Sequence, residues 1–151
     1  MRELQIKTAL QISRSPQEVF EAVVDPKQMS NYFISESSGR MEEGRTLEWK
    51  FPEFEDSAEI KVVELIPQEY VSFLWEGAKN KKLLVEMTFL EMPNESTLLR
   101  ITEGKMEDDE AGLKWLGQNT EGWANFLACL KAYLEYGVNL RKGAFDFMRE
   151  N

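Results

Sequence analysis

The chain has 151 residues, of which 42% are hydrophobic and 30% charged, and its formal net charge is −9. A chain of this length is expected to fold as one domain, residues 1–151, large enough to bury about two-thirds of the surface that its unfolded form exposes. The excess of 27 acidic over 18 basic residues argues against binding to nucleic acid or to anionic lipid, because both depend on positive charge.

Targeting signals and disulfides are not predicted. The first 13 residues alternate between polar and apolar types and so do not resemble the continuous apolar core of a signal peptide. No segment approaches the roughly 20 apolar residues of a transmembrane helix. Cys129 is the single cysteine, which excludes an intrachain disulfide. We therefore expect a cytoplasmic protein without membrane insertion.

The first third of the chain predicts a strand followed by two short helices. Residues 4–12 alternate with period two, which is typical of a half-buried strand. Ser15 and Glu18 fit a capping box, Pro16 fits the first helical position, and Asp25-Pro26 ends the first helix. A second short helical segment is predicted to extend from residue 27 to Phe33.

Residues 35–103 return to period two, and glycine and proline divide them into short strands of an antiparallel meander. One face of these strands is predicted to carry apolar side chains at every second position. They are Leu47, Trp49, Phe51, Ile60, Val62, Val71, Phe73, Trp75, Leu83, Val85, Met87, Phe89, Leu99 and Ile101. Glu103, after the last of them, is expected at a solvent-facing strand end.

The last predicted element is a long amphipathic helix that ends at Gly137. Its apolar face is predicted to contain Leu116, Asn119, Trp123, Leu127, Leu130 and Leu134, with Thr120 and Phe126 at the margins. Cys129 lies away from the centre of this face and is interpreted as a packed or idle thiol. Beyond the helix, the tail 139–151 carries Phe145, Phe147 and Met148 and could dock on its own domain, form a dimer contact or fray.

A sheet with one apolar face must bury that face, and the last helix is the only predicted element long and apolar enough to cover it. The sequence therefore predicts an α+β helix-grip fold. In it, a curved antiparallel sheet of six to seven strands wraps around a long C-terminal helix, and two short helices follow the first strand.

Four segments carry a resemblance to a known family: "SPQEVFEAVVDPKQMSNYF", "VVELIPQEYVSFLW", "LRITEGK" and "NTEGWANFLACLKAYLEYG". In this order they resemble the START-like and birch-pollen-allergen superfamily. Within it they are most similar to homologues of the C-terminal domain of the activator of the ninety-kilodalton heat-shock protein ATPase. The resemblance covers roughly residues 4–137, and its most specific part is the Gly122-Trp123 pair before the leucine-spaced helix.

The resemblance implies a helix-grip fold whose hydrophobic cavity often holds a small apolar or amphipathic molecule, including lipids. Combined with the strand pattern, it predicts a ligand site with no metal and no cofactor. The candidate residues are Trp49, Phe51, Phe73, Trp75, Val85, Met87, Phe89, Ile101, Asn119, Trp123 and Leu127. The alternative is that these aromatic residues form a solid core. The buried amide of Asn119 would then meet a backbone carbonyl or a neighbouring side chain instead of a water or a ligand.

Catalytic patterns are poorly represented. The sequence contains no histidine, which excludes Ser-His-Asp and Cys-His arrangements and histidine-containing zinc sites. An enzyme would have to rely on Glu, Asp, Tyr, Lys or Cys for proton transfer. The first hypothesis is therefore a non-enzymatic carrier or sensor of a small hydrophobic molecule. The second is a protein-interaction or co-chaperone module with a role in stress response, whose partner is a chaperone, another protein or a second copy of the chain.

Overall fold

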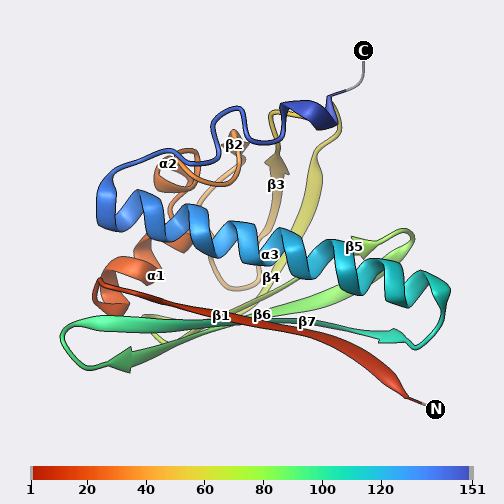
Figure 1. Cartoon of the computed structure of the whole chain (residues 1–151), viewed down its shortest axis with the longest axis horizontal. Helices are drawn as coiled ribbons and strands as arrows, with labels where there is room; N and C mark the ends of the chain where they lie inside the picture. The colour runs from red at the N-terminus through yellow and green to blue at the C-terminus, as the bar shows by residue number, and fades with distance from the viewer. Residues whose placement is uncertain (1, 150–151) are drawn as a thin grey trace.

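The computed structural model describes residues 2–149, and it confirms the predicted helix-grip fold: a curved antiparallel sheet lies under one long helix (Figure 1). Two short helices follow the first strand, as expected. In chain order the elements are β1 (Glu3–Ile12), α1 (Pro16–Val24), α2 (Pro26–Met29), β2 (Glu36–Ser37), β3 (Thr46–Lys50), β4 (Ala58–Ile66), β5 (Tyr70–Ala78), β6 (Lys81–Met92), β7 (Ser96–Glu107), α3 (Glu110–Tyr136) and a 3-10 turn at Asp146–Met148.

All seven strands belong to one sheet with the order β1-β7-β6-β5-β4-β3-β2. Each strand from β2 to β6 pairs with the next one in the chain, as in a meander, and β1 pairs with β7. The register places Phe73 opposite Val85 and Met87 opposite Ile101, all of them buried on the face that α3 covers. The period-two pattern of the sequence is thus the inward face of the sheet.

Each short helix begins at a side-chain cap, of which the sequence predicts the first, at Ser15. The Ser15 side chain accepts a hydrogen bond from the Glu18 amide, and the Asp25 side chain accepts one from the Lys27 amide. The second helix is shorter than predicted, because it ends at Met29 and the chain continues to Phe33 in turns. Tyr32, within these turns, donates a hydrogen bond of 2.9 Å to the carbonyl of Ala22.

Helix α3 ends at Gly137, as its sequence predicts. Asp109 caps its first turn by accepting from the Gly112 amide, and Gly137 ends it in the left-handed conformation with φ 64°. Its buried face differs from the predicted one. Trp115 and Cys129 are buried, whereas Leu116 and Leu134 are only partly buried. No helix within residues 2–149 combines the length and apolar composition needed to cross a membrane.

The tail docks on its own chain, which is the first of the three alternatives left by the sequence. Figure 1 shows it running from the end of α3 back toward β3. Arg141 donates to both carboxylate oxygens of Glu53, at 2.8 and 3.1 Å, and Arg149 donates to the carbonyl of Pro52 at 3.0 Å. The tail therefore covers the end of the sheet at which β3 terminates.

Candidate functional site

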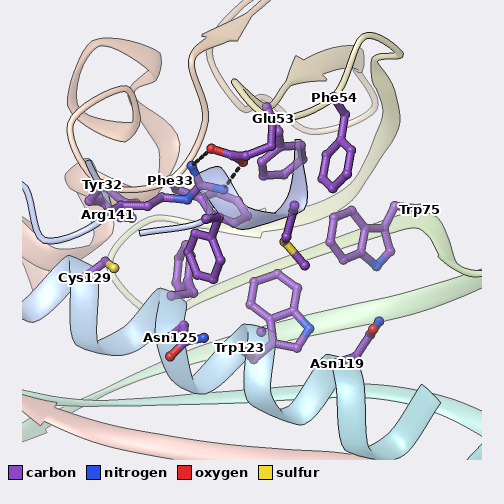
Figure 2. A pocket seen from close by; sticks show the side chains of 15 residues that line it. Tyr32, Phe33, Glu53, Phe54, Trp75, Asn119, Trp123, Asn125, Cys129 and Arg141 are labelled. Atoms are coloured by element: carbon purple, nitrogen blue, oxygen red, sulfur yellow. Dashed lines mark hydrogen bonds and ion pairs between the residues drawn. The ribbon is translucent and has the colours of Figure 1, made fainter. Parts of the chain in front are cut away.

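A cavity of about 220 Å³ lies where the tail meets α3, the turns after α2 and the ends of β3 and β5 (Figure 2). Its walls are mostly aromatic. The lining residues are Tyr32, Phe33, Phe51, Glu53, Phe54, Trp75, Asn119, Gly122, Trp123, Asn125, Phe126, Cys129, Arg141, Phe145 and Met148. Residues from five separate segments of the chain thus meet around one space.

The aromatic wall is held by edge-to-face contacts between rings. Phe33 is central to it, with its ring centroid 4.7 Å from that of Phe126, 5.2 Å from Phe51 and 5.5 Å from Trp49. The indoles of Trp75 and Trp123 lie 5.4 Å apart. Such geometry is favourable beyond burial alone and restricts the rings to defined positions. The wall is therefore expected to keep its shape without a ligand.

A fully buried carboxylate lies directly behind this wall. Glu103 on β7 is 0% exposed and accepts hydrogen bonds from the indole nitrogens of Trp123, at 2.6 Å, and Trp115, at 3.1 Å. The expectation that Glu103 faces solvent is wrong: β7 continues to Glu107, so Glu103 occupies an inward position in the middle of the strand. All of its partners are N–H donors on α3, which suits the acceptor-only character of a carboxylate.

Asn119 joins the same buried group. Its amide nitrogen donates to the carbonyl of Gly77 at 2.9 Å and to Glu103 at 3.1 and 3.4 Å. The amide nitrogen is thus met by a backbone carbonyl and a neighbouring side chain, which was one of the two alternatives. Gly77 makes room for this arrangement, because a Cβ atom at that position would lie 2.0 Å from the Oε2 atom of Glu103.

The outer wall of the cavity is closed by an ion pair that sequence reasoning missed. The side chains of Glu53 and Arg141 are 4% and 14% exposed, and the guanidinium lies 5.7 Å from the Phe51 ring centroid and 4.9 Å from that of Phe145. Burial raises the pKa of the Cys129 thiol on the adjoining wall, while the charge of Arg141 offsets part of that rise. The tail therefore supplies both a charge and apolar side chains to the site.

Two indole nitrogens remain without a hydrogen-bond partner among residues 2–149, those of Trp49 and Trp75. A buried donor without a partner costs about 1–3 kcal/mol. Trp49 is in the core, whereas Trp75 lines the cavity. Trp75 thus contributes ring surface to the cavity, while its N–H group is itself buried and has no partner within the described part of the chain.

The predicted ligand residues divide into two groups. Phe51, Trp75, Asn119 and Trp123 come together at the cavity. Seven others lie in the packed core instead: Trp49, Phe73, Val85, Met87, Phe89, Ile101 and Leu127, each at most 4% exposed. Phe33, Phe54 and the tail residues line the cavity without being among the predicted site residues, although the apolar side chains beyond Gly137 were a signal for Phe145 and Met148.

Metal ligands do not gather in the described structure. Within residues 2–149 no group of three or more Asp, Glu or Cys side chains could hold a metal ion. The cavity is thus defined by aromatic surface and a few hydrogen-bonding groups.

The curved sheet, the long C-terminal helix and the aromatic cavity define a START-like helix-grip protein. The chain belongs to the family described as activator of Hsp90 ATPase homolog 1-like protein, whose family model matches residues 13–135. A search of curated proteins finds no match.

Solved structures agree with this assignment. The protein SSP2350 from Staphylococcus saprophyticus has 31% sequence identity and a TM-score of 0.77, over 89% of this chain and 94% of that one. The Aha1 dimer from Colwellia psychrerythraea has 23% identity and a TM-score of 0.75, over 89% and 98%. DynU16, a putative protein in the dynemicin biosynthetic locus, has 24% identity and a TM-score of 0.78 over 89% of this chain. The match spans 48% of DynU16, about half of its length.

Proposed function

We propose that the protein binds a small hydrophobic or amphipathic molecule in the aromatic cavity and acts as a non-enzymatic carrier or sensor in the cytoplasm. The observation that carries this proposal is the cavity wall itself, in which aromatic rings from separate segments surround a space with few polar groups. Ligand sites have this composition, because apolar surface supplies affinity while isolated polar groups fix orientation.

The cavity is partly open to solvent, and its size indicates which ligands it could largely bury. A buried apolar cavity of about 150 Å³ is known to accept benzene. At about 220 Å³ this cavity is somewhat larger, which favours one or two fused rings or a short acyl chain over a full-length lipid. The presence of DynU16 in a biosynthetic locus gives general support to a small-molecule role for this fold.

Filling the cavity from α3 tests the proposal. Gly122 lines the cavity, and a Cβ added there meets nothing within 4 Å. Gly122→Leu is therefore expected to place a side chain in the ligand's space without a backbone clash and to lower affinity for naphthalene-sized probes at least tenfold. Replacing a helical glycine should also stabilise the fold by up to about 1 kcal/mol. Equilibrium dialysis and thermal unfolding measure the two effects.

Gly117→Leu is the matched control, because Gly117 also lies on α3 in open space but does not line the cavity. This variant should keep the affinity of the wild type and gain similar stability. If the two variants bind equally well, the probe does not occupy the cavity. If the wild type binds no probe and carries no small molecule after purification, the proposed function is wrong.

The protein-interaction or co-chaperone module is the second candidate, and it has its own observation. Apolar side chains remain exposed around the start and end of the tail: Tyr136 is 72% exposed and Phe147 79%, and Val138, Leu140 and Met148 are about half exposed. Large exposed apolar side chains can contribute to a binding surface. The related Aha1 from Colwellia psychrerythraea was solved as a dimer, so a second copy of this chain is one candidate partner. Light scattering at increasing concentration tests this, and a constant monomer mass would exclude the homodimer.

A further inference from the structure

We infer that the ligand of the cavity is a cationic amphiphile, an apolar body with an ammonium or guanidinium head, and that this head replaces the chain's own Arg141 beside Glu53. This inference rests on the proposed function, because it specifies the chemistry of a ligand in the same cavity. It depends on what surrounds the guanidinium of Arg141 and on how the tail that carries it is held.

The guanidinium of Arg141 has the surroundings of a bound organic cation. It donates to both carboxylate oxygens of Glu53 and lies 5.7 Å from the ring centroid of Phe51 and 4.9 Å from that of Phe145. Figure 2 shows the ion pair beside the aromatic residues of the cavity wall. A positive charge within about 6 Å of an aromatic face is attracted to it, which is how aromatic cages bind quaternary ammonium groups. Glu53 and Phe51 lie outside the tail, so both stay in place when the tail moves.

The carboxylate of Glu53 requires a positive partner. Its side chain is 4% exposed, and within residues 2–149 its hydrogen bonds come from Arg141 alone. A buried charge whose partner is removed is strongly unfavourable. The chain after it adds the exposed acids Glu55 and Asp56 and has no basic residue before Lys61, which favours the approach of a cation. Glu53 is therefore paired either by Arg141 or by a cation that replaces it.

The tail is held weakly enough to be displaced. Among residues 138–149 only Arg141 and Phe145 are not exposed, and the regular structure of this segment is limited to the 3-10 turn at Asp146–Met148. Gly137, in the left-handed conformation, separates the segment from α3. Segments with few buried contacts open at a lower free energy than the core. The tail can thus leave with Arg141 while the sheet and α3 remain folded, and Arg141 competes with the ligand for Glu53.

Two probes of the same shape test the inference: (2-naphthylmethyl)trimethylammonium and 2-neopentylnaphthalene, in which carbon replaces the charged nitrogen. Arg141→Met removes the competing charge and keeps a long, unbranched side chain. In the full chain it should raise affinity for the cationic probe at least about tenfold and change affinity for the neutral probe little. Equilibrium dialysis gives the dissociation constants, and thermal unfolding confirms that the variant is folded.

Two further variants show whether the gain comes from Glu53. Adding Glu53→Gln to Arg141→Met keeps the size of the side chain but removes its charge, so it should abolish the gain. Arg149→Met is the matched control, because Arg149 is an arginine of the same tail that contacts Pro52 and Asp146 and does not line the cavity. It should leave both affinities as in the wild type.

Trypsin gives a second readout on the unaltered protein, which does not depend on the folding of any variant. Trypsin can cut after Arg141 only when this side chain has left Glu53. Saturating cationic probe should therefore accelerate this cut, measured by mass spectrometry relative to the cut after exposed Lys79, whereas the neutral probe should not.

The outcomes distinguish the inference from the proposed function. If the neutral probe binds, but Arg141→Met favours both probes equally or the two probes have the same effect on the cut after Arg141, the cation inference is overturned and the proposed function stands. Binding of neither probe to the wild type or to any variant would overturn both.

Discussion

Replacing Glu103 with leucine is expected to lower the free energy of unfolding by roughly 2–6 kcal/mol, since two buried indole N–H groups lose their acceptor at about 1–3 kcal/mol each. Trp115 and Trp123 are both about 3% exposed, so water cannot replace the carboxylate without a rearrangement of α3. Typical domains are stable by only about 5–15 kcal/mol, which makes this a large fraction of the total. Urea unfolding followed by circular dichroism measures the change.

Further variants test whether the stability depends on the hydrogen bonds that Glu103 accepts or only on a side chain that fills its position. Glu103→Gln keeps one acceptor oxygen but turns an NH₂ group toward a donor, so its loss should be intermediate. Gly77→Ala keeps Glu103 but displaces its carboxylate, because the added Cβ would lie 2.0 Å from Oε2. Glu107→Gln, at an exposed position on the same strand, should change stability by less than about 0.5 kcal/mol. Equal stability of the leucine variant and this control would contradict the anchoring role.

The architecture could be predicted because it depends on local sequence patterns that correspond directly to features of the folded protein. Alternating apolar residues mark the inward faces of β3 to β7, the Ser15 side chain marks the first turn of α1, and Gly137 marks the end of α3. These features depend on neighbours a few positions apart, which the sequence displays directly. The curvature of the sheet around α3 then follows, because the apolar face must be buried and α3 is the longest element available to cover it.

Glu103 shows where this reasoning fails. Period two places it inward with Leu99 and Ile101, but its charge argued for a strand end. The donors that make its burial tolerable come from Trp115, Asn119 and Trp123, 12 to 20 positions later. Contacts between residues so far apart in the sequence leave no spacing pattern in either segment. A prediction based on the charge of Glu103 alone therefore placed it on the wrong side of the sheet.

The cavity contains only part of the predicted residue set, for a related reason. Phe51, Trp75, Asn119 and Trp123 line it, whereas others such as Phe73 and Met87 lie in the packed core beneath α3. The outer wall of the cavity requires the contact between Glu53 and Arg141, 88 positions apart. The sequence predicted apolar residues in the tail but contained no signal for where the tail would dock.

Ending the chain after Gly137 is expected to accelerate the reaction of Cys129 with a thiol reagent at least about tenfold. A buried thiol reacts only when the protein opens locally, so its reaction rate follows the population of open states. Cys129 is 5% exposed and lines the cavity that Arg141, Phe145 and Met148 cover. Without these residues the thiol should face solvent, while the sheet and α3 keep their own contacts. The rate of reaction with Ellman's reagent at pH 8 measures the effect.

A single substitution, Arg141→Ala, distinguishes opening of the tail from a change in the pKa of Cys129. The charge of Arg141 lowers the pKa of Cys129, so removing that charge alone would raise the pKa, leave less thiolate and slow the reaction. A faster reaction in Arg141→Ala can therefore arise only because the tail opens. Glu53→Ala should give a similar acceleration, and the double variant little more, since both changes break the same pair. Arg149→Ala, which removes an exposed contact with Pro52, should react at the wild-type rate. Slower modification of Arg141→Ala would mean that the guanidinium acts on Cys129 through its charge alone and that the tail is held over the cavity by other contacts.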